Sequence, residues 1–455
     1  MISLQALDAM LLEHLPDHLA RQRWSGVQGR SITGVELLWQ EVVLADDPML
    51  IWTVARVRLD DGQQQDYQLF LGVRSAYEMP SFLEGKDREL VGLATTPDHV
   101  VVYDALVDPD LAIEVLHLVD PDAEVSVRRP IVLEHSNSSV VYDEAHILKV
   151  LRKVESGPNP DVEITRVLAA RGCEHVLAPL AELRRDGIDL AVLREFLVGS
   201  TEGWELARAS VRDVLAGGTS PEDSGADFAP DAARLGSVLA SLHLAMADAW
   251  GRTKADAGRW ASEMEADLES MVGSARDALP AELDVDAIAD RFRALAKLTD
   301  AGMEIRIHGD LHLGQLVKSD AGWKVLDFEG EPARRRDERF TTSSPLRDVA
   351  GMLRSLHYAA LTGLHEWAAG DSPELLPLVE QWEQRNRDAL RSSYFNTAGI
   401  TDLLPSTPEA LALVLDAFEL DKAVYEVGYE RGHRPDQVSI PVAGIMRLLA
   451  AAEPQ

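Results

Sequence analysis

The pattern of hydrophobic and polar positions changes character near the middle of the chain. In the first half, short apolar runs and alternating patterns predict strands, with one amphipathic helix at the start and another further along. The predicted strands are Val42–Ala45, Leu50–Leu59, Tyr67–Val73, Pro130–Leu133, Val140–Tyr142, Ile147–Leu151 and Leu190–Phe196, and the predicted helices are Met1–Leu19 and Pro160–Ala170. Asp60, Asp61 and Gly62 predict a hairpin turn between two of the strands. The first half is therefore expected to be rich in β-structure.

The second half has the periodicity of α-helices. It follows a small, acidic stretch, Ala216–Ala232, that is typical of a surface loop. The predicted helices are Ala233–Trp250, Arg259–Leu279, Asp284–Ala301, Pro345–Thr362, Glu374–Asn396, Thr407–Gly432 and Pro441–Ala452. A strand-rich stretch, Glu304–Glu331, interrupts them. A mostly β first half and a mostly α second half predict an α+β chain of two lobes, and ligands favour the cleft between such lobes.

Composition and charge narrow the classes of function. The chain has 455 residues, 46% hydrophobic and 26% charged, which is typical of a globular protein of two or three domains. Its 44 Lys and Arg residues stand against 76 Asp and Glu residues, a formal net charge of −32. A field of that sign repels a phosphate backbone, so we expect neither nucleic acid nor an anionic membrane surface as a partner.

The start of the chain and its cysteine content indicate a compartment. The first residues lack the basic head and unbroken apolar run of a signal peptide, and no stretch approaches the roughly 18 apolar residues of a transmembrane helix. The single cysteine, Cys173, has no partner for an internal disulfide, which fits a reducing environment. We therefore expect a cytoplasmic protein.

The strongest chemical signal lies in Ile305–Pro332, whose sequence is IRIHGDLHLGQLVKSDAGWKVLDFEGEP. Asp310 follows His308, Gln315 comes five residues later, and Asp327 comes twelve residues after that. Phosphoryl transfer needs a carboxylate that takes the proton of the acceptor hydroxyl, and oxygen ligands that hold Mg²⁺ against the nucleotide phosphates. Asp310 suits the first role, Gln315 and Asp327 suit the second, and His308 is expected to be a scaffold residue. The spacing is that of the kinase pattern H-R-D-x-x-x-x-N followed by D-F-G.

The first half supplies candidate nucleotide-binding residues in the order expected of a kinase. Lys149 lies in a predicted strand and Glu163 on the following helix, as in kinases whose strand lysine holds the phosphates and pairs with a helix glutamate. A lone strand lysine is more often a solvated edge residue, so the order of the residues carries this prediction. The turn Ser136-Asn137-Ser138-Ser139 lies where a kinase has its glycine-rich loop, and its hydroxyl and N–H groups suit phosphate. Leu193–Leu197 lies at the expected hinge, which places Glu195 and Leu197 next to adenine.

One predicted helix near the C-terminus combines charged and aromatic side chains. Lys422, Tyr425, Glu426 and Tyr429 are spaced so that they share a face. Carboxylate and ammonium groups bond sugar hydroxyls, and aromatic rings stack on pyranose rings, so this face suits a sugar site. The alternative is a buried Lys–Glu pair between two packing tyrosines, which the periodicity alone favours.

These motifs resemble those of the bacterial maltokinases, members of the aminoglycoside-phosphotransferase-like kinases. The matching segments are Arg21-Gln22-Arg23-Trp24, the Ser/Asn turn, Ile147–Leu168, Glu202-Gly203-Trp204, HGDLHLGQ, LDFEGEP, Ser344–Ser355 and Glu419–Pro435. They run from near the N-terminus almost to the C-terminus. The chain departs from the family pattern at Ser25-Gly26 after Trp24, and at Asp436-Gln437, where a tryptophan is usual.

The resemblance implies a bilobal, protein-kinase-like fold, ATP and Mg²⁺ as cofactors, and phosphorylation of the anomeric hydroxyl of maltose to maltose 1-phosphate, a step of glycogen biosynthesis. The expected parts are an N-terminal cap of residues 1–96, a nucleotide-binding lobe of residues 97–200 and a mostly helical lobe of residues 201–455. The residues expected at the acceptor site are Asp310, His312, Glu329, Asp416, Glu419, Lys422, Tyr425, Glu426 and Tyr429. The family also suggests a maltose-producing enzyme as a partner.

Two alternatives stay open. Related glucosamine kinases phosphorylate an amino sugar, and Asp416, one turn before Glu419, offers a carboxylate for its 2-ammonium group. An exposed helix position is the other explanation of Asp416. The second alternative is an inactive kinase fold used as a binding module, although such a module has no need of the complete set of catalytic residues.

Overall fold

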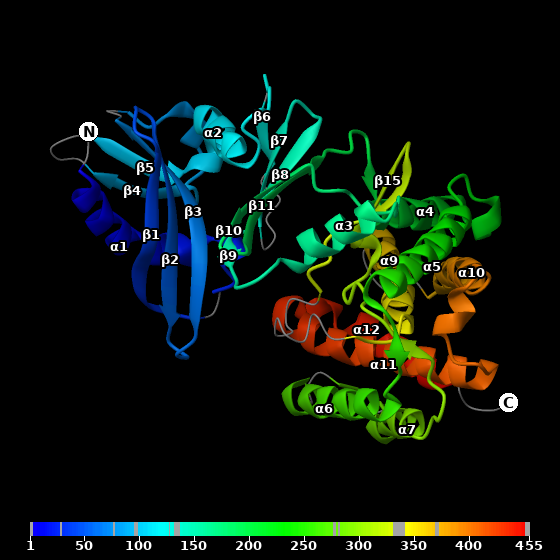
Figure 1. Cartoon of the computed structure of the whole chain (residues 1–455). Coiled ribbons are helices and arrows are strands. Elements are labelled where there is room, and N and C mark those ends of the chain that lie inside the picture. The colour runs from blue at the N-terminus through cyan, green and yellow to red at the C-terminus, as the bar shows by residue number, and fades with distance from the viewer. Residues whose placement is uncertain are drawn as a thin grey trace. The chain divides into compact units, whose positions relative to one another are not determined.

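The structure is a computed structural model of the chain (Figure 1). It describes residues 3–27, 30–75, 78–94, 99–126, 128–131, 137–275, 279–280, 283–330, 342–368 and 373–450. The chain divides into two compact units. The first is Met1–Arg166 with Leu177–Val198, and the second is Val167–Val176 with Gly199–Gln455.

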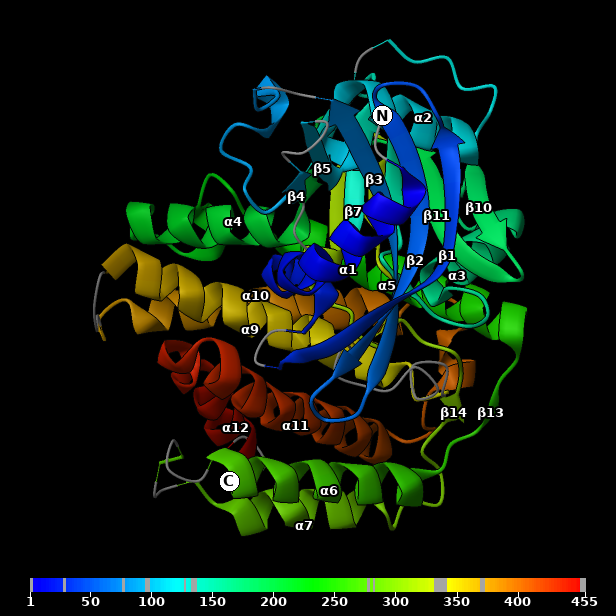
Figure 2. The ribbon, with the colours of Figure 1, turned by 90° about the vertical axis from the view of Figure 1, so that its left-hand side faces the viewer.

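The first unit begins with a helix and a large antiparallel sheet. The helix α1 (Leu4–Arg21) precedes β1 (Ile32–Leu44), β2 (Met49–Leu59), β3 (Gln64–Ser75), β4 (Leu90–Ala94) and β5 (Val100–Asp104). The strands pair in the order β1-β2-β3-β5-β4, and the short β9 (Lys153–Val154) pairs with β3. One face of the sheet is covered by α1 (Figure 2). Because β5 belongs to this sheet, the sheet continues past residue 96, and the predicted cap boundary there stays a prediction.

A second antiparallel sheet completes the first unit. Its strands are β6 (Arg128–Ile131), β7 (Ser138–Tyr142), β8 (His146–Val150), β10 (Ala181–Arg185) and β11 (Ile188–Glu195), in the order β10-β11-β8-β7-β6. The helix α2 (Pro109–Val119) shares one apolar core with side chains of both sheets. The helix α3 (Pro160–Ala170) packs on the second sheet through Val162, which meets Leu151 and Val192.

The central strands of the first sheet are apolar on both faces. In β2, Leu50 and Trp52 enter the core shared with α2, whereas Ile51 and Ala55 enter the core beneath α1. Side chains alternate along a strand, so burial on both faces produces a nearly continuous apolar run. The run makes β2 predictable from sequence. The half-exposed β1 has a weaker signal, which predicted only Val42–Ala45 of it.

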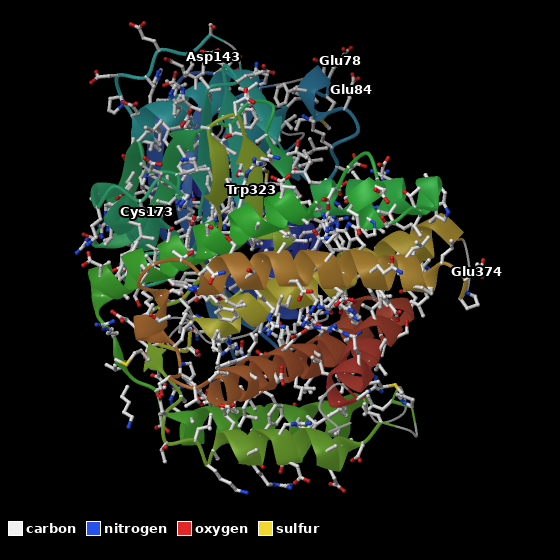
Figure 3. The ribbon with its side chains drawn as sticks, turned by 90° about the vertical axis from the view of Figure 1, so that its right-hand side faces the viewer. Glu78, Glu84, Asp143, Cys173, Trp323 and Glu374 are labelled. Carbon is white, nitrogen blue, oxygen red and sulfur yellow. The ribbon has the colours of Figure 1, made fainter. Side chains whose placement is uncertain are left out.

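The second unit is mainly helical. Its long helices are α4 (Gly203–Gly217), α5 (Ala229–Trp250), α6 (Ala257–Ala275), α7 (Val285–Leu295), α9 (Leu346–Ala368), α10 (Leu376–Phe395), α11 (Pro408–His433) and α12 (Ser439–Ala450). Figure 3 shows α10 beside α5, and α11 packs against α9, α6 and α12. The predicted loop Ala216–Ala232 is wrong at its ends, because α4 continues to Gly217 and α5 begins at Ala229. A β-rich first unit and a helical second unit confirm the α+β class.

Short strands of the second unit carry the predicted catalytic motif. The strands β12 (Thr201–Glu202), β15 (Leu316–Ser319) and β16 (Gly322–Val325) form one small sheet, and β13 (Thr253–Lys254) pairs with β14 (Met303–Glu304). The motif segment connects β14 to β15 and includes a 3-10 helix, Leu313–Gln315. Among the helices of the described ranges, none has the length and apolar character needed to cross a membrane.

Candidate active site

His308 holds the loop that follows β14. Its ring Nε2–H donates to the backbone carbonyl of Leu326 (2.9 Å), and its Nδ1 accepts the backbone N–H of Asp310 (3.3 Å). The ring also packs against Phe328, with the centroids 4.8 Å apart. Both ring nitrogens therefore serve the backbone, which confirms that His308 is a scaffold residue.

Asp348, in the first turn of α9, fixes the backbone just before Asp310. Its carboxylate accepts the N–H groups of His308 (2.8 Å) and Gly309 (2.9 Å) and a hydrogen bond from His243 Nε2 (3.1 Å). Burial by itself would raise the pKa of Asp348, but the hydrogen bond and charge of His243 and the N–H of Gly309 hold this pKa below its ordinary value. The buried carboxylate is therefore ionised and anchors the loop.

Two glycines allow the loop and α9 to approach closely. Gly309 has a φ of +85°, a left-handed conformation that favours glycine. A Cβ atom at Gly351 of α9 would lie 2.5 Å from the Leu311 carbonyl oxygen. A larger residue at Gly351 would therefore displace the loop that carries Asp310.

Asp310 borders a small pocket of the second unit. One of its carboxylate oxygens lies 3.1 Å from Lys422 Nζ, and both side chains are about one-fifth exposed. Lys422 Nζ lies 4.9 Å from the ring centroid of Tyr425. The pocket is further lined by Asp267 of α6, Arg347 of α9, and Phe418, Asp421 and Tyr425 of α11. Carboxylates beside cations and an aromatic ring suit a small polar ligand with hydroxyl or ammonium groups.

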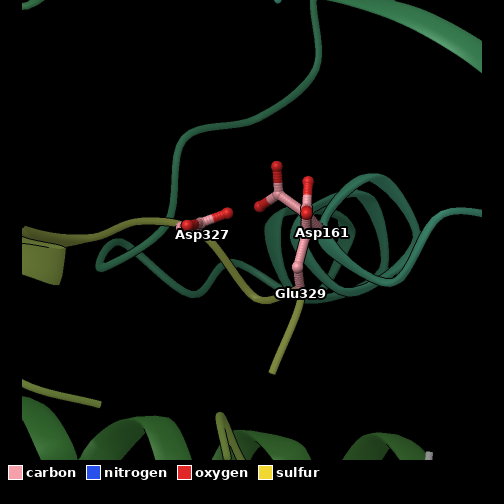
Figure 4. Close-up of side chains that lie close together, drawn as sticks. All are labelled: Asp161, Asp327 and Glu329. Carbon is pink, nitrogen blue, oxygen red and sulfur yellow. The ribbon is translucent and has the colours of Figure 1, made fainter. Parts of the chain in front are cut away.

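The predicted metal ligands Gln315 and Asp327 lie next to each other. Gln315 Nε2 donates to Asp327 Oδ2 (3.3 Å), and the Leu326 N–H donates to the Gln315 carbonyl (2.8 Å). Asp327 has a φ of +63°, an uncommon conformation for a residue with a side chain. Glu329 lies on the same loop, and it and Asp327 offer carboxylate oxygens within 4.8 Å of each other (Figure 4). Amide and carboxylate oxygens fit Mg²⁺, so Gln315 Oε1, Asp327 and Glu329 are suited to hold it. The predicted place of Glu329 at the acceptor site stays a prediction.

Lys149 forms an ion pair with a carboxylate of α3 that was not predicted. Its Nζ lies 3.3 Å from Asp161 Oδ2, and Arg194 of β11 donates to the same oxygen at 2.9 Å. Asp161 is buried in the first turn of α3 (Figure 4), where Asn159 accepts its backbone N–H (2.9 Å) and caps the helix. The pairing of Lys149 with Glu163 stays a prediction.

The Ser/Asn turn is described in part. Ser136 lies outside the described residues, whereas Asn137 and Ser138 are half-buried. Ser139 is opposite Lys149 in the pairing of β7 with β8. This register brings the end of the turn next to the strand that carries the lysine, and phosphate binding by the turn stays a prediction.

The predicted hinge follows β11. Glu195, the last residue of β11, is exposed, and Leu197 is half-buried. Between them, the Phe196 N–H donates to the Ala145 carbonyl (2.8 Å). Contact of Glu195 and Leu197 with adenine stays a prediction.

His312 shapes the catalytic loop. Its Nδ1 accepts the Gly314 N–H (3.1 Å) and so caps the 3-10 helix Leu313–Gln315. Burial lowers the pKa of His312; the charge of Asp310 opposes this shift, and the charge of Lys422 adds to it. His312 is therefore neutral at pH 7, and its contact with a sugar stays a prediction.

Glu419 and Glu426 pair with arginines of neighbouring helices. Both carboxylate oxygens of Glu419 accept hydrogen bonds from Arg387 of α10 (2.7 and 2.9 Å), and Glu419 is buried. Glu426 accepts two hydrogen bonds from the buried Arg354 of α9 (3.0 and 2.7 Å). A buried guanidinium needs a carboxylate partner, so these two residues hold α11 against its neighbours. Neither lines the pocket at Asp310, and their contact with a sugar stays a prediction.

The remaining predicted residues of α11 are divided. Lys422 and Tyr425 line the pocket. Tyr429 is 44% exposed and stacks on Tyr425, with the centroids 6.3 Å apart. The expected common face of Lys422, Tyr425, Glu426 and Tyr429 is thus shared between two neighbourhoods, because Glu426 turns to Arg354.

Asp416 lies on the side of α11 that carries Glu419. Burial and the charge of Glu419 raise the pKa of Asp416, and Arg291 is among the residues whose charges oppose this shift. Asp416 is half-buried, so the explanation as an exposed helix position is wrong. Its contact with an amino sugar stays a prediction, and Asp267 and Asp421 are the carboxylates that join Asp310 and Asp348 around the pocket.

Several polar residues of these sites were not predicted: Asp161, Arg194, Asp267, Asp348 and Asp421. Asp161, Asp348 and Asp421 lie inside segments that carried the family resemblance, so a signal for them existed. Asp267 stands on a helix without a motif, and only the packing of α6 on α11 brings it to the pocket.

Comparison with known proteins identifies relatives along most of the chain. A family model described as the maltokinase N-terminal cap domain matches residues 18–108. A glucosamine kinase of Streptacidiphilus jiangxiensis is 28% identical over 445 residues, which cover 90% of this chain and 98% of that protein. A glucosamine kinase of Mycolicibacterium smegmatis (strain ATCC 700084 / mc(2)155) is 26% identical over 336 residues, which cover 70% of this chain and 79% of that protein.

A solved structure has the same fold. It is that of glucosamine kinase in complex with glucosamine, ADP and inorganic phosphate, and it aligns with a TM-score of 0.67 and 21% identity over 91% of this chain and 95% of that chain. The likeness agrees with the predicted kinase-like fold. Residues 18–108 therefore match the maltokinase N-terminal cap domain, and most of the chain is similar to proteins named glucosamine kinase.

Proposed function

We propose that the chain is an ATP- and Mg²⁺-dependent sugar kinase whose acceptor is an amino sugar of the glucosamine type. The observation that carries the proposal is the pocket at Asp310, where Asp267 and Asp421 add two carboxylates. An ammonium group on the acceptor would be recognised by such carboxylates, because charge-assisted hydrogen bonds are stronger than neutral ones. The two relatives named glucosamine kinase support the same choice.

The residues of the second unit would carry the chemistry. Asp310 accepts the proton of the acceptor hydroxyl while the hydroxyl oxygen bonds to the γ-phosphorus and ADP leaves. Lys422, 3.1 Å from Asp310, orients that carboxylate and the sugar hydroxyls. When bound, Mg²⁺ neutralises the charge of the phosphates, and Gln315, Asp327 and Glu329 are the residues that would hold it.

The residues of the first unit would bind the nucleotide. Lys149 is the cation for the phosphates, and Asp161 fixes its direction through the 3.3 Å ion pair. The turn at Asn137–Ser139 supplies hydroxyl and N–H groups for the same phosphates. Glu163, Glu195 and Leu197 complete the proposed nucleotide-binding set.

Maltose is the second candidate acceptor. The match to the maltokinase cap at residues 18–108 and the motif around Lys422 support it. In that case the product would be maltose 1-phosphate, the role would lie in glycogen biosynthesis, and a maltose-producing enzyme would be the expected partner.

An acceptor panel tests the proposal. Glucosamine, glucose, maltose and an aminoglycoside are compared at matched concentration with ATP–Mg²⁺, and kcat/KM is measured for each. We expect the highest value for glucosamine. A higher value for maltose would replace glucosamine by the second candidate, and absence of Mg²⁺-dependent ATP binding would support the inactive binding module.

The variant Asp421→Asn tests whether the carboxylate of Asp421 recognises the ammonium group of the acceptor. We expect kcat/KM for glucosamine to fall about tenfold, the cost of one hydrogen bond to a charged group, and kcat/KM for neutral glucose to change little. Glu409→Gln is the matched control, because Glu409 is an exposed carboxylate in the first turn of the same helix. An equal loss for both sugars in Asp421→Asn would contradict recognition of the ammonium group.

A further inference from the structure

A buried arginine of the first unit, Arg152, links the N-terminal sheet to the Ser/Asn turn. Arg152 follows β8, three residues after Lys149, and is 1% exposed. Its Nε donates to Ser138 Oγ (2.8 Å), its terminal nitrogen Nη2 pairs with Asp104 at the end of β5, and its guanidinium lies 4.9 Å from the ring centroid of Trp24. Three different segments therefore meet at one guanidinium.

The bond to Ser138 has a defined chemical consequence. A serine hydroxyl has one hydrogen to donate and two lone pairs to accept. Because Arg152 Nε occupies a lone pair of Ser138 Oγ, the hydroxyl hydrogen stays available for another acceptor. Ser138 is also opposite Val150 in the β7–β8 pair, one position from the pair of Ser139 with Lys149. The hydroxyl is thus held at the end of the turn proposed to bind phosphate.

The N-terminal sheet holds the segment around Arg152 at further points. Gln68 of β3 is fully buried, and its side-chain amide donates to the carbonyls of Leu151 (2.6 Å) and Leu190 (2.5 Å). The backbone N–H of Gln68 donates to the Arg152 carbonyl (2.9 Å). Directly after Arg152, β9 pairs with β3. The main chain of this segment is therefore fixed independently of the arginine side chain, which leaves that side chain to act on Ser138.

We propose that Arg152 is a positioning residue for nucleotide binding: held by Trp24 and Asp104 of the N-terminal part, it orients the Ser138 hydroxyl so that the hydroxyl donates to a phosphate of the bound nucleoside triphosphate. The inference rests on the proposed function, since it assumes that the Ser/Asn turn binds phosphate. It gives the Trp24 motif a role beyond packing, because Trp24 supplies the aromatic face on which the cation rests.

A double-mutant cycle in the full-length chain tests the inference. ATP–Mg²⁺ is titrated by calorimetry into the wild type, Arg152→Lys, Ser138→Ala and the double variant. Lysine keeps the charge but cannot make the forked contacts of a guanidinium. We expect Arg152→Lys and Ser138→Ala each to raise the Kd for ATP about tenfold. The double variant should bind ATP no more weakly than Ser138→Ala, because each substitution removes the same hydrogen bond, the one from the Ser138 hydroxyl to the phosphate. The KM for sugar is expected to stay unchanged.

Arg74→Lys is the matched control. Arg74 pairs with Asp108 (3.0 Å) in the same N-terminal part and is half-buried, but its hydrogen bonds go to Tyr103, Asp108 and Asp110 rather than to the turn. Its Kd for ATP is expected to equal that of the wild type. If Arg152→Lys does not fold, Asp104→Asn takes its place in the cycle. This variant keeps a hydrogen-bond acceptor for Arg152 but removes the negative charge of residue 104, and the same non-additivity with Ser138→Ala is expected.

The outcomes separate the inference from the proposed function. A wild-type chain that binds no ATP would overturn the proposed function. ATP binding that is unchanged in Arg152→Lys, weakened equally in Arg74→Lys, or weakened additively with Ser138→Ala would overturn the role of Arg152 and leave the kinase assignment intact.

Discussion

At the scale of single residues, Asp161 brings two cations of the first unit to one oxygen. Arg194 and Lys149 both contact its Oδ2, but they differ in burial: the side chain of Arg194 is 9% exposed and that of Lys149 is 19% exposed. A buried carboxylate without a cation would be costly. Arg194 meets that need within the core, so the ammonium group of Lys149 is able to serve a phosphate without loss of the fold.

Lys149→Met should therefore weaken nucleotide binding and leave the stability of the fold nearly unchanged. We expect the KM for ATP to rise about tenfold, the order of one hydrogen bond to a charged group, with a small change in melting temperature because Arg194 still pairs with Asp161. Steady-state kinetics and thermal unfolding measure the two effects. Lys86→Met, in a loop of the same unit, is the control. Unchanged ATP kinetics in Lys149→Met would remove Lys149 from the site.

The sequence pattern did not show that Asp161 pairs with Lys149. The order of the motifs located the lysine strand and the following helix. Asp161 and Glu163 are two positions apart on α3, so their side chains leave the helix in directions about 160° apart. Which of them faces β8 depends on how Val162 packs against Leu151 and Val192, and this contact is set by the whole sheet.

At the scale of elements, α11 presents two polar faces to different neighbours. Phe418, Asp421, Lys422 and Tyr425 recur at helical spacing and line the pocket at Asp310, whereas Glu426 turns to Arg354 on α9. The periodicity predicted the helix within one residue at each end. It carried no information on which polar face meets the pocket, because Arg354 comes from a helix far away in the sequence.

The two faces should respond differently to substitution. Glu426→Gln leaves buried Arg354 without its anionic partner, so we expect the unfolding free energy to fall by roughly 3 kcal/mol with little change in the KM for sugar. Lys422→Met should do the opposite, raising the KM for sugar with little loss of stability. Denaturant unfolding measures the stability of the two variants, and steady-state kinetics measures their KM for sugar. A raised sugar KM with unchanged stability in Glu426→Gln would restore Glu426 to the acceptor site.

At the scale of the whole molecule, the contacts that sequence predicts are those that a short stretch of chain creates. Gln315 and Asp327 are neighbours because β15 and β16 form a hairpin in which Leu316 pairs with Val325. The spacing of Gln315 and Asp327 was therefore enough to predict that they lie next to each other. Asp267 reaches the pocket from α6 only when several helices have packed, so no local pattern predicts it. The division into a β-rich and a helical unit follows from periodicity summed over long segments, which is why it was predictable.

Replacing Asp310 by Asn tests most directly whether this residue is the base of a sugar kinase. Asparagine keeps the volume but cannot take the proton of the acceptor hydroxyl, so we expect kcat to fall by roughly 10²- to 10⁴-fold with ATP binding and melting temperature unchanged. Asp320→Asn, on the exposed turn between β15 and β16, should retain full activity. Release of ADP is followed with ATP–Mg²⁺ and the best acceptor of the panel. Turnover of Asp310→Asn near that of the wild type would contradict the assignment of Asp310 as the catalytic base.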